Sequence, residues 1–227
     1  MTCVGVILAK NEADRYLANA IRSLDLLCDR VLVLDDGSTD DTATLAESMG
    51  AEVRRREGPA MWGQEAPARA ELWAWGAEVA GDGWLYVLDA DHVTEAPVGA
   101  WRGMLASTEA NAWGIRLYDC WDSPQRHRVD GYWVGHELAR PWLFRPSACP
   151  EPVWPTRGLH CGHAPANFPY RLGVAPSSVW IRHLGWMNAT DREAKVARYM
   201  SAANQLRPDE MAHLQSVTDD NHPCPNP

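Results

Sequence analysis

The sequence predicts an α/β domain built on a mostly parallel, twisted sheet with helices on both faces, followed by a C-terminal helical segment. Two observations lead to this fold class. Short apolar runs bounded by glycine or acidic residues alternate with helical repeats over about the first hundred residues, and such runs are typical of strands buried on both faces. The connections are short, and right-handed β-α-β units of this kind give parallel strands with helices packed on the sheet.

The elements of the first half follow from this alternation. Leu17, Ile21, Leu24 and Leu27 repeat at helical spacing between two apolar runs, which predicts an amphipathic helix. The predicted elements are a strand over 4–8, a helix over 17–27, a strand over 31–34, a helix over 41–49 that stops at Gly50, a strand over 51–54, a helix over 67–79, a strand over 84–88, a helix over 97–107 and a strand over 112–118.

The second half of the chain is less regular. Residues 119–180 are rich in Trp, Pro, Arg and His and carry no assignable element, and so long a connection is expected to carry function. A short strand is predicted over 180–184. Thr190 and Glu193 form a capping box that opens a helix ending at Pro208. A short helix can follow, and a polar, disordered tail is expected over 218–227. The apolar face of the capped helix is predicted to consist of Val196, Met200, Ala203 and Leu206.

Composition and charge narrow the function classes. The 227 residues are 46% hydrophobic and 22% charged, as expected for a globular protein with a sizeable core. A net charge of -9 argues against charge-driven binding to nucleic acid or to an anionic membrane. No apolar stretch is as long as a membrane span, and the segment after Met1 is predicted to be a core strand and not a signal peptide. Six cysteines without C-x-x-C spacing complete the expectation of a cytoplasmic protein with free thiols.

An acidic pair at the end of a strand is the strongest candidate for a site. Asp89 and Asp91 directly follow the predicted strand over 84–88, and ligands of open α/β sheets bind at the carboxyl ends of strands. Carboxylate oxygens suit Mg²⁺ or Mn²⁺, which usually complete their coordination with substrate phosphates. Acidic pairs also occur in ordinary surface turns, so this pair alone does not establish a metal or ligand site. Neither a Rossmann fingerprint nor a P-loop is present.

Three motifs taken together resemble the family 2 glycosyltransferases of GT-A fold. They are residues 10–12 after the first strand, 33–42 after the second, and 88–91, which contain the acidic pair. His183 and the helical residues 195–199 are similar to the C-terminal part of that family. The resemblance implies one domain over 1–217. Its first half, about 1–110, is expected to bind a nucleoside-diphosphate sugar, and its second half, about 111–217, an acceptor.

The resemblance also implies roles for single residues. The departing diphosphate is doubly charged, so a divalent cation, Mn²⁺ or Mg²⁺, is expected to neutralise it. Asp36 would accept a hydrogen bond from the nucleobase, which favours a UDP-sugar, and Arg69 would lie near the diphosphate. The implied metal ligands are Asp91 and His183, and the implied donor-binding residues are Ala9, Glu12, Asp36, Arg69, Asp89 and Ala90.

The catalytic base is expected in the acceptor half, because it must lie opposite the departing diphosphate and within about 3 Å of the acceptor hydroxyl. Asp130 is the first choice, since Tyr132 and Trp133 would partly desolvate its carboxylate. Glu137 and His160 follow it. The full set of candidates is Asp119, Asp122, Asp130, Glu137, His160 and His163.

The predicted function is metal-dependent, inverting glycosyl transfer, and two alternatives stay open. A sugar-1-phosphate nucleotidyltransferase uses a similar sheet and a metal, but it carries a glycine-rich loop where this chain has residues 9–12. The second alternative is a non-catalytic module that binds nucleotide sugar or glycan. The presence of all three residues Asp89, Asp91 and His183 argues against it. Arg69 could also be a surface ion-pair partner, and His183 a core histidine.

Overall fold

A mixed sheet forms the centre of the computed structural model, which describes residues 1–58, 61–156, 159–201, 206–218 and 223–225. Within these residues the strand order is β3-β2-β1-β4-β7-β6-β9-β5, and β8 pairs with β6. The strands are β1 Cys3–Ala9, β2 Arg30–Asp35, β3 Glu52–Arg55, β4 Trp84–Asp89, β5 His92–Glu95, β6 Ala112–Asp119, β7 Arg140–Phe144, β8 Leu172–Val174 and β9 Trp180–His183.

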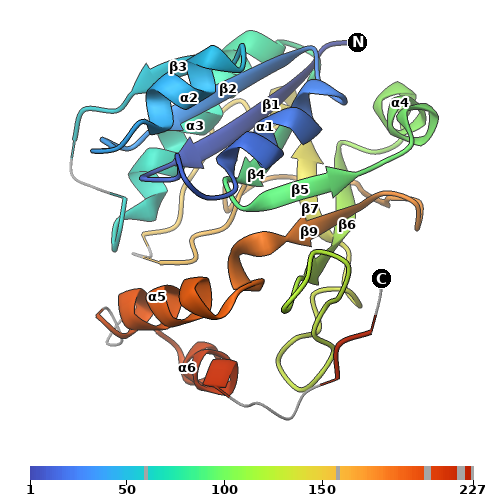
Figure 1. The fold of residues 1–227 in the computed structure, drawn as a ribbon. Helices are drawn as coiled ribbons and strands as arrows, with labels where there is room; N and C mark the ends of the chain where they lie inside the picture. The colour runs from blue at the N-terminus through green and yellow to red at the C-terminus, as the bar shows by residue number, and fades with distance from the viewer. Residues whose placement is uncertain (59–60, 157–158, 202–205, 219–222, 226–227) are drawn as a thin grey trace.

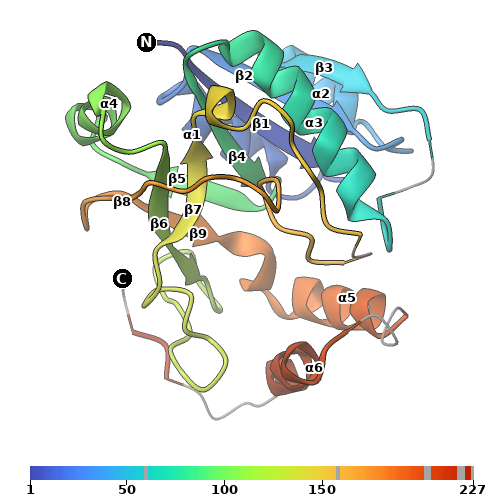
Figure 2. The ribbon, with the colours of Figure 1, turned by 180° about the vertical axis from the view of Figure 1, so that it is seen from behind.

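Helices cover both faces of this sheet, as the sequence predicts. In Figure 1 α1 and α2 lie in front of the parallel strands, and in Figure 2 α3 crosses them from the other side. The α-helices are α1 Leu17–Asp25, α2 Thr42–Ser48, α3 Glu65–Ala80, α4 Val98–Ala106, α5 Ala189–Met200 and α6 Pro208–Gln215, and the 3₁₀ turns are η1 Pro146–Ala148, η2 Leu184–Trp186 and η4 Ser216–Thr218.

The parallel half of the sheet matches the sequence prediction. β2 and β4 flank β1, β3 extends the sheet beyond β2, and all these pairs are parallel. The other half is mixed, because β7 runs antiparallel to both β4 and β6, and β5 runs antiparallel to β9. The predicted α/β class with a mostly parallel sheet is therefore confirmed, with its antiparallel pairs confined to the part after β4.

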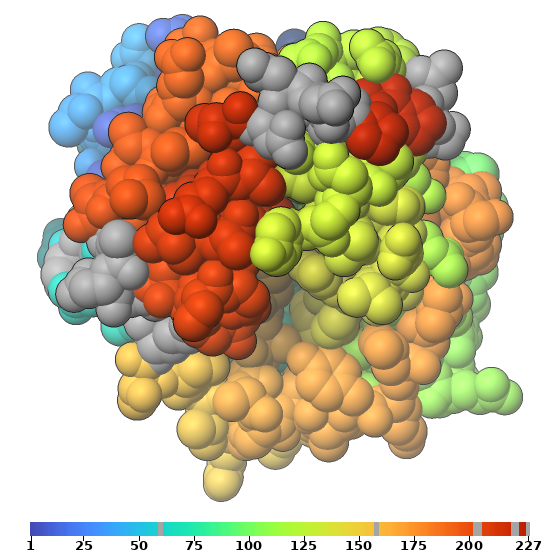
Figure 3. Space-filling model, turned by 90° about the horizontal axis from the view of Figure 1, so that it is seen from below, coloured from blue at the N-terminus to red at the C-terminus, as the bar shows by residue number. Residues whose placement is uncertain are grey.

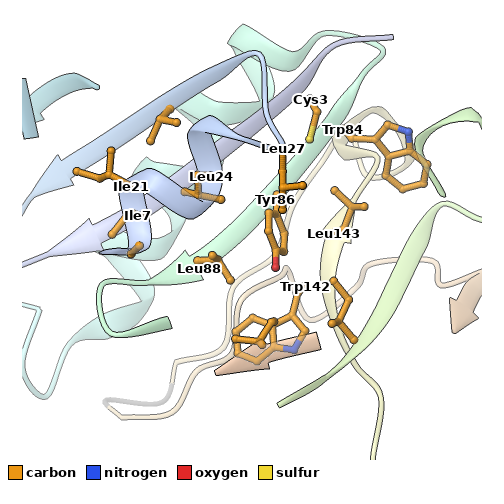
Figure 4. Packing of buried hydrophobic residues seen from close by; sticks show 14 of the residues in the cluster. Cys3, Ile7, Ile21, Leu24, Leu27, Trp84, Tyr86, Leu88, Trp142 and Leu143 are labelled. Atoms are coloured by element: carbon orange, nitrogen blue, oxygen red, sulfur yellow. The ribbon is translucent and has the colours of Figure 1, made fainter. Parts of the chain in front are cut away.

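Two apolar layers hold the sheet and its helices together. In one layer Leu24 of α1 packs with Ile7 of β1 and Tyr86 of β4 (Figure 4). In the other, Leu72 of α3 packs with Val6 and its neighbours on the opposite face. Full burial of one such side chain stabilises the fold by about 1.5–3 kcal/mol. The layers fix the carboxyl ends of β1 and β4 side by side.

Several elements differ from the sequence prediction. The expected helix over 67–79 begins at Glu65, and β5, β7 and β8 were not predicted. The N-cap of α5 is Asn188, whose side chain accepts a hydrogen bond from the Asp191 amide, so the predicted capping box at Thr190 is wrong. Asn188 is the N-cap because its side-chain oxygen accepts from the N–H of Asp191, three residues later, which is otherwise unpaired at the start of the helix.

The predicted apolar face of α5 is correct only in part, because Val196 and Leu206 pack against a buried cluster that contains Trp133 and Trp186, whereas Met200 does not. Its Met200 is 48% exposed, and its buried residue is Lys195, which is 7% exposed. The helix ends at Met200, and the part of the prediction over 202–205 lies outside the described residues. A short helix, α6, follows as expected, beginning at Pro208.

Part of the expected disordered tail is held in place. The carbonyls of Pro223 and Pro225 accept hydrogen bonds from the amides of Val129 and His127, at 3.3 and 3.0 Å. The expectation of disorder is thus incorrect for residues 223–225, while 219–222 and 226–227 lie outside the described residues. No helix within the described ranges is both long and apolar enough to cross a membrane.

Candidate active site

A cavity of about 600 Å³ opens at the carboxyl ends of the central strands. The ends of β1, β4 and β9 line it together with α5 and α6, so the sheet supplies one wall and the C-terminal helices another. Seen from below, these helices, in orange and red, lie beside the yellow-green segment that precedes β7 (Figure 3). Ligands of open α/β sheets bind at this edge, and the cavity is therefore the candidate active site.

Asp91, His183 and Lys195 meet at the base of the cavity. The Lys195 Nζ lies 2.8 Å from Asp91 Oδ2 and 3.0 Å from His183 Nε2, and those two acceptor atoms are 3.3 Å apart. Although burial acts to raise the pKa of Asp91, the charge of Lys195 holds it well below its ordinary range. Asp91 is therefore an ionised carboxylate with an ammonium group against it.

Asp119, at the end of β6, orients the ring of His183. Its Oδ1 is 2.7 Å from His183 Nδ1. Burial and the Lys195 charge act to lower the pKa of His183, but Asp91 and Asp119 outweigh them and raise it. Because an ammonium can only donate, its contact with Nε2 requires the tautomer with the proton on Nδ1, which Asp119 accepts. The Nε2 lone pair consequently points at the cation.

His92 lies behind this group and is neutral. Burial and the nearby His183 lower its pKa to about 3, and its ring meets that of His183 edge to face with centroids 4.7 Å apart. Its Nε2 is 3.8 Å from Asp91 Oδ1. A neutral imidazole in this place can act as an acceptor or as a metal ligand.

Asp89 is held by two basic residues. Its Oδ1 is 2.6 Å from Arg69 Nη2, and its Oδ2 is 3.2 Å from His163 Nε2. Burial acts to raise the pKa of Asp89, but these two neighbours hold it well below its ordinary range. The Nε and Nη1 of Arg69 are buried and have no partner within the described part of the chain. Arg69 lines the cavity, so its guanidinium charge lies where an anionic ligand would bind, although these two N–H groups are themselves buried.

Glu12 is a buried carboxyl group on the same side of the cavity. Its Oε1 lies 3.4 Å from Arg15 Nη1, and its Oε2 has no partner among the described residues. Burial raises the pKa of Glu12 to about 7, Arg15 opposes this and Asp91 adds to it. Glu12 therefore exchanges its proton near neutral pH.

Aromatic rings form one wall of the cavity. The ring of Tyr199 stacks on that of His160 at 5.3 Å with an interplanar angle of 10°, and meets Trp62 edge to face at 5.2 Å. The guanidinium of Arg198 lies 5.2 Å from the centre of the Trp62 ring. Flat aromatic faces suit the stacking of a base or a sugar ring.

The cavity brings together most of the residues expected to bind donor and metal. Glu12, Arg69, Asp89, Ala90, Asp91 and His183 all line it. Ala9 and Asp36 do not. Ala9 is buried in β1, and Asp36 accepts hydrogen bonds from Arg56 Nη1 and the Met61 amide, both at 2.7 Å. Acceptance of a nucleobase N–H by Asp36 stays a prediction and requires it to share an oxygen with one of these donors.

The three candidate bases are separated in the structure. His160 lines the cavity, whereas Asp130 and Glu137 do not. The carboxylate of Asp130 is 2.8 Å from the Nε of the buried Arg128, and Glu137 is exposed. Assignment of the base stays a prediction, and the geometry favours His160 over the other two because it reaches the space that a ligand would fill.

Four residues of the site were either given no role from the sequence or considered for a different one. Lys195 was noted only within a helix, because an apolar pattern of period 3.6 does not count a buried cation. His92 directly follows the acidic pair, which was the available signal. Asp119 and His163 were weighed only as bases, whereas they hold His183 and Asp89 in place.

The residues around Asp91 fit a divalent cation. Asp91, His92 and His183 each offer one ligand atom, and these atoms all lie within 4.8 Å of one another. The ammonium of Lys195 between two of them shows that this position attracts positive charge. A carboxylate oxygen with imidazole nitrogens is a donor set that suits Mn²⁺ and, with fewer imidazoles, Mg²⁺.

The architecture and this site define a glycosyltransferase domain of GT-A fold, in which a parallel half-sheet ends in an aspartate pair and a second, antiparallel strand brings a histidine to it. More specifically, the chain belongs to the glycosyl transferase family 2, whose model matches residues 6–160. The expected family and fold are thereby confirmed.

Curated relatives match over different lengths. An uncharacterized protein of Mycobacterium tuberculosis is 29% identical over 199 residues, covering 84% of this chain and 48% of the relative. The chain thus spans about half the length of that relative. An uncharacterized glycosyltransferase of Rickettsia felis is 51% identical over 47 residues, which cover 21% of this chain and 16% of the relative.

Solved structures of glucosyl-3-phosphoglycerate synthase from Mycobacterium tuberculosis are also similar. The complex with Mn²⁺, UDP and glucosyl-3-phosphoglycerate has a TM-score of 0.37 at 24% identity, over 52% of this chain and 44% of that one. The complex with Mn²⁺, UDP and phosphoglyceric acid has a TM-score of 0.41 at 19% identity, over 65% and 56% of the two chains.

Proposed function

We propose that this domain transfers a sugar from a nucleoside-diphosphate sugar to an acceptor hydroxyl, in a single displacement that depends on a divalent cation. The observation that carries this proposal is the pairing of Asp91 with His183 Nε2 around a positive charge, at the end of a sheet whose cavity is also lined by Arg69. Cation ligands and guanidinium donors together suit a diphosphate.

Asp91 and His183 would hold Mn²⁺ or Mg²⁺, with His92 behind them as a further imidazole. When bound, the cation neutralises the charge that develops on the departing diphosphate. Asp119 keeps the Nε2 of His183 free of its proton by accepting from Nδ1. Arg69 is suited to a diphosphate oxygen, and Asp89 to a ribose hydroxyl once one of its present partners shifts.

His160 is the base in this proposal. Its ring lies on the cavity wall, stacked on Tyr199, and a neutral imidazole can take the proton of an acceptor hydroxyl. The donor is proposed to be a UDP-sugar, because the carboxylate of Asp36 can accept from the imide N–H of uracil. With one displacement, the product has the inverted anomeric configuration.

The test is an assay of products with Mn²⁺, a panel of nucleoside-diphosphate sugars and candidate acceptors, with Asp91→Asn as the matched control. Glycosyl transfer gives free nucleoside diphosphate and a glycoside of inverted configuration, and both should be lost in the control. In a parallel incubation with a nucleoside triphosphate and a sugar 1-phosphate, release of pyrophosphate would identify a nucleotidyltransferase instead. Tight donor binding without turnover for any acceptor would identify a binding module.

A further inference from the structure

We propose that Lys195 is a built-in counter-cation. Its ammonium fills the cation position while the site holds no donor, and it must leave that position when metal and nucleoside diphosphate bind. The proposal rests on the metal-dependent function proposed above, and it adds a residue that couples the binding of the metal to that of the diphosphate.

The ammonium and a metal ion compete for the same atoms. Nζ of Lys195 contacts Asp91 Oδ2 at 2.8 Å and His183 Nε2 at 3.0 Å. An imidazole nitrogen has one lone pair in the plane of its ring, so His183 Nε2 cannot accept from the ammonium and coordinate a metal ion together. Binding of the metal through His183 therefore requires Lys195 to move.

Lys195 is held firmly in the cation position. It is 7% exposed, and its Nζ lies 4.6 Å from the centre of the Trp186 ring, over its face. Gly185 passes so close that a Cβ there would overlap both the Asp91 carboxylate and the ammonium. The helix that carries Lys195 is also held in place, because at the start of α5 the Tyr16 hydroxyl donates a hydrogen bond to Asp191 at 2.6 Å. The ammonium is thus part of the packed base of the cavity.

The buried carboxylate of Asp91 needs a positive charge beside it. A buried carboxylate without a partner is costly, and removal of one member of a buried ion pair strongly destabilises the folded protein. Lys195 neutralises Asp91 when no metal is present. The same attraction must be overcome by an incoming metal ion, which weakens its binding.

A diphosphate offers the displaced ammonium a new partner. Lys195 lines the cavity on the same face of α5 as Arg198 and Tyr199, at spacings of three and four residues. Its flexible stem lets the ammonium turn from the metal position toward the cavity, where diphosphate oxygens would accept its hydrogen bonds. Metal alone leaves the ammonium without an anion, whereas metal with diphosphate supplies one. Lys195 thereby makes the two ligands bind cooperatively.

The test is Mn²⁺ binding to the whole protein, measured from the EPR signal of free Mn²⁺ with and without UDP. Lys195→Met keeps the stem and removes the charge. We expect it to bind Mn²⁺ at least tenfold more tightly than the wild type without UDP, and to lose at least tenfold of the enhancement that UDP gives. Lys195→Gln, whose side chain is more polar than methionine, should also bind Mn²⁺ more tightly than the wild type without UDP.

Arg198→Met is the matched control, because it removes one positive charge from the same face of α5 without a contact to Asp91. It should change Mn²⁺ binding in the absence of UDP less than threefold. Unchanged or weaker Mn²⁺ binding in both Lys195 variants, with normal binding in the presence of UDP, overturns the role of Lys195 alone. Absence of Mn²⁺ binding to every variant with and without UDP overturns the metal-dependent function, and the role of Lys195 with it.

Discussion

Replacement of Glu12 by glutamine should stabilise the metal-free protein above pH 7 and change its stability little near pH 4.5. The Glu12 carboxyl group is buried, one of its oxygens has no partner among the described residues, and its pKa is raised from 4.5 to about 7. Ionisation of this group in the folded protein is therefore unfavourable. Glutamine has nearly the same shape and carries no charge at any pH.

The direction in which Glu12 changes stability with pH follows from proton linkage. Between pH 4.5 and about 7 the folded protein binds the Glu12 proton more tightly than the unfolded chain does, so stability is full below pH 4.5 and falls as the pH rises through this range. One pKa unit corresponds to about 1.4 kcal/mol, which sets an upper limit of about 3 kcal/mol. Glu12→Gln also loses the contact with Arg15, which reduces the gain in stability. We therefore expect the free energy of unfolding of the variant to exceed that of the wild type by about 1–3 kcal/mol at pH 8.

The assay is urea unfolding of wild type and Glu12→Gln at a series of pH values from 4.5 to 8.5, with EDTA present. Other titrating groups contribute equally to both proteins and cancel in the difference. The difference should grow with pH up to about 7.5 and then level off. A difference that is constant, or that grows toward low pH, would refute the argument from burial.

Three further results are expected. Asp91→Asn should abolish the extra thermal stabilisation that Mn²⁺ gives to the UDP complex, and a Mn²⁺-dependent shift of the wild-type size would contradict its role as a ligand. His160→Gln should lower kcat by about 10²-fold or more with donor Kd unchanged, as expected for loss of a general base, whereas Asp130→Asn should retain near-normal kcat. Asp36→Asn should reduce the preference for UDP over CDP measured by calorimetry, and an unchanged preference would exclude its role in base recognition.

The parallel half of the fold could be predicted from the sequence because its strands are buried on both faces. Residues 4–8 and 84–88 are continuous apolar runs, and both are strands in the structure. β7 was missed because it is short and contains Pro141, and β5 because it has only four residues and its buried ones, His92 and Thr94, are polar. Short strands of this kind form through their neighbours in the sheet, which local patterns do not reveal.

The candidate site could be predicted in part for a similar reason. Asp91 lies in a motif next to its strand, and His183 in a strand that the pattern also predicts. Asp130 was favoured for its aromatic neighbours, but the buried Arg128 from the same loop engages its carboxylate. Lys195 was not assigned a role because a buried lysine is rare, and only the fold shows that its charge faces Asp91.

The pairing of β5 with β9 determines which parts of the domain can vary in sequence and length without moving Asp91 and His183. His92 and His183 are register partners in one antiparallel ladder, and Leu184 donates its amide to the Asp91 carbonyl at 2.8 Å. Hydrogen bonds between these two strands therefore set the spacing of the proposed cation ligands, independently of the length of the segment that joins the strands. Lengthening a loop costs little free energy. The loop between β6 and β7 can thus be extended to admit a different acceptor while the spacing of Asp91 and His183 stays unchanged.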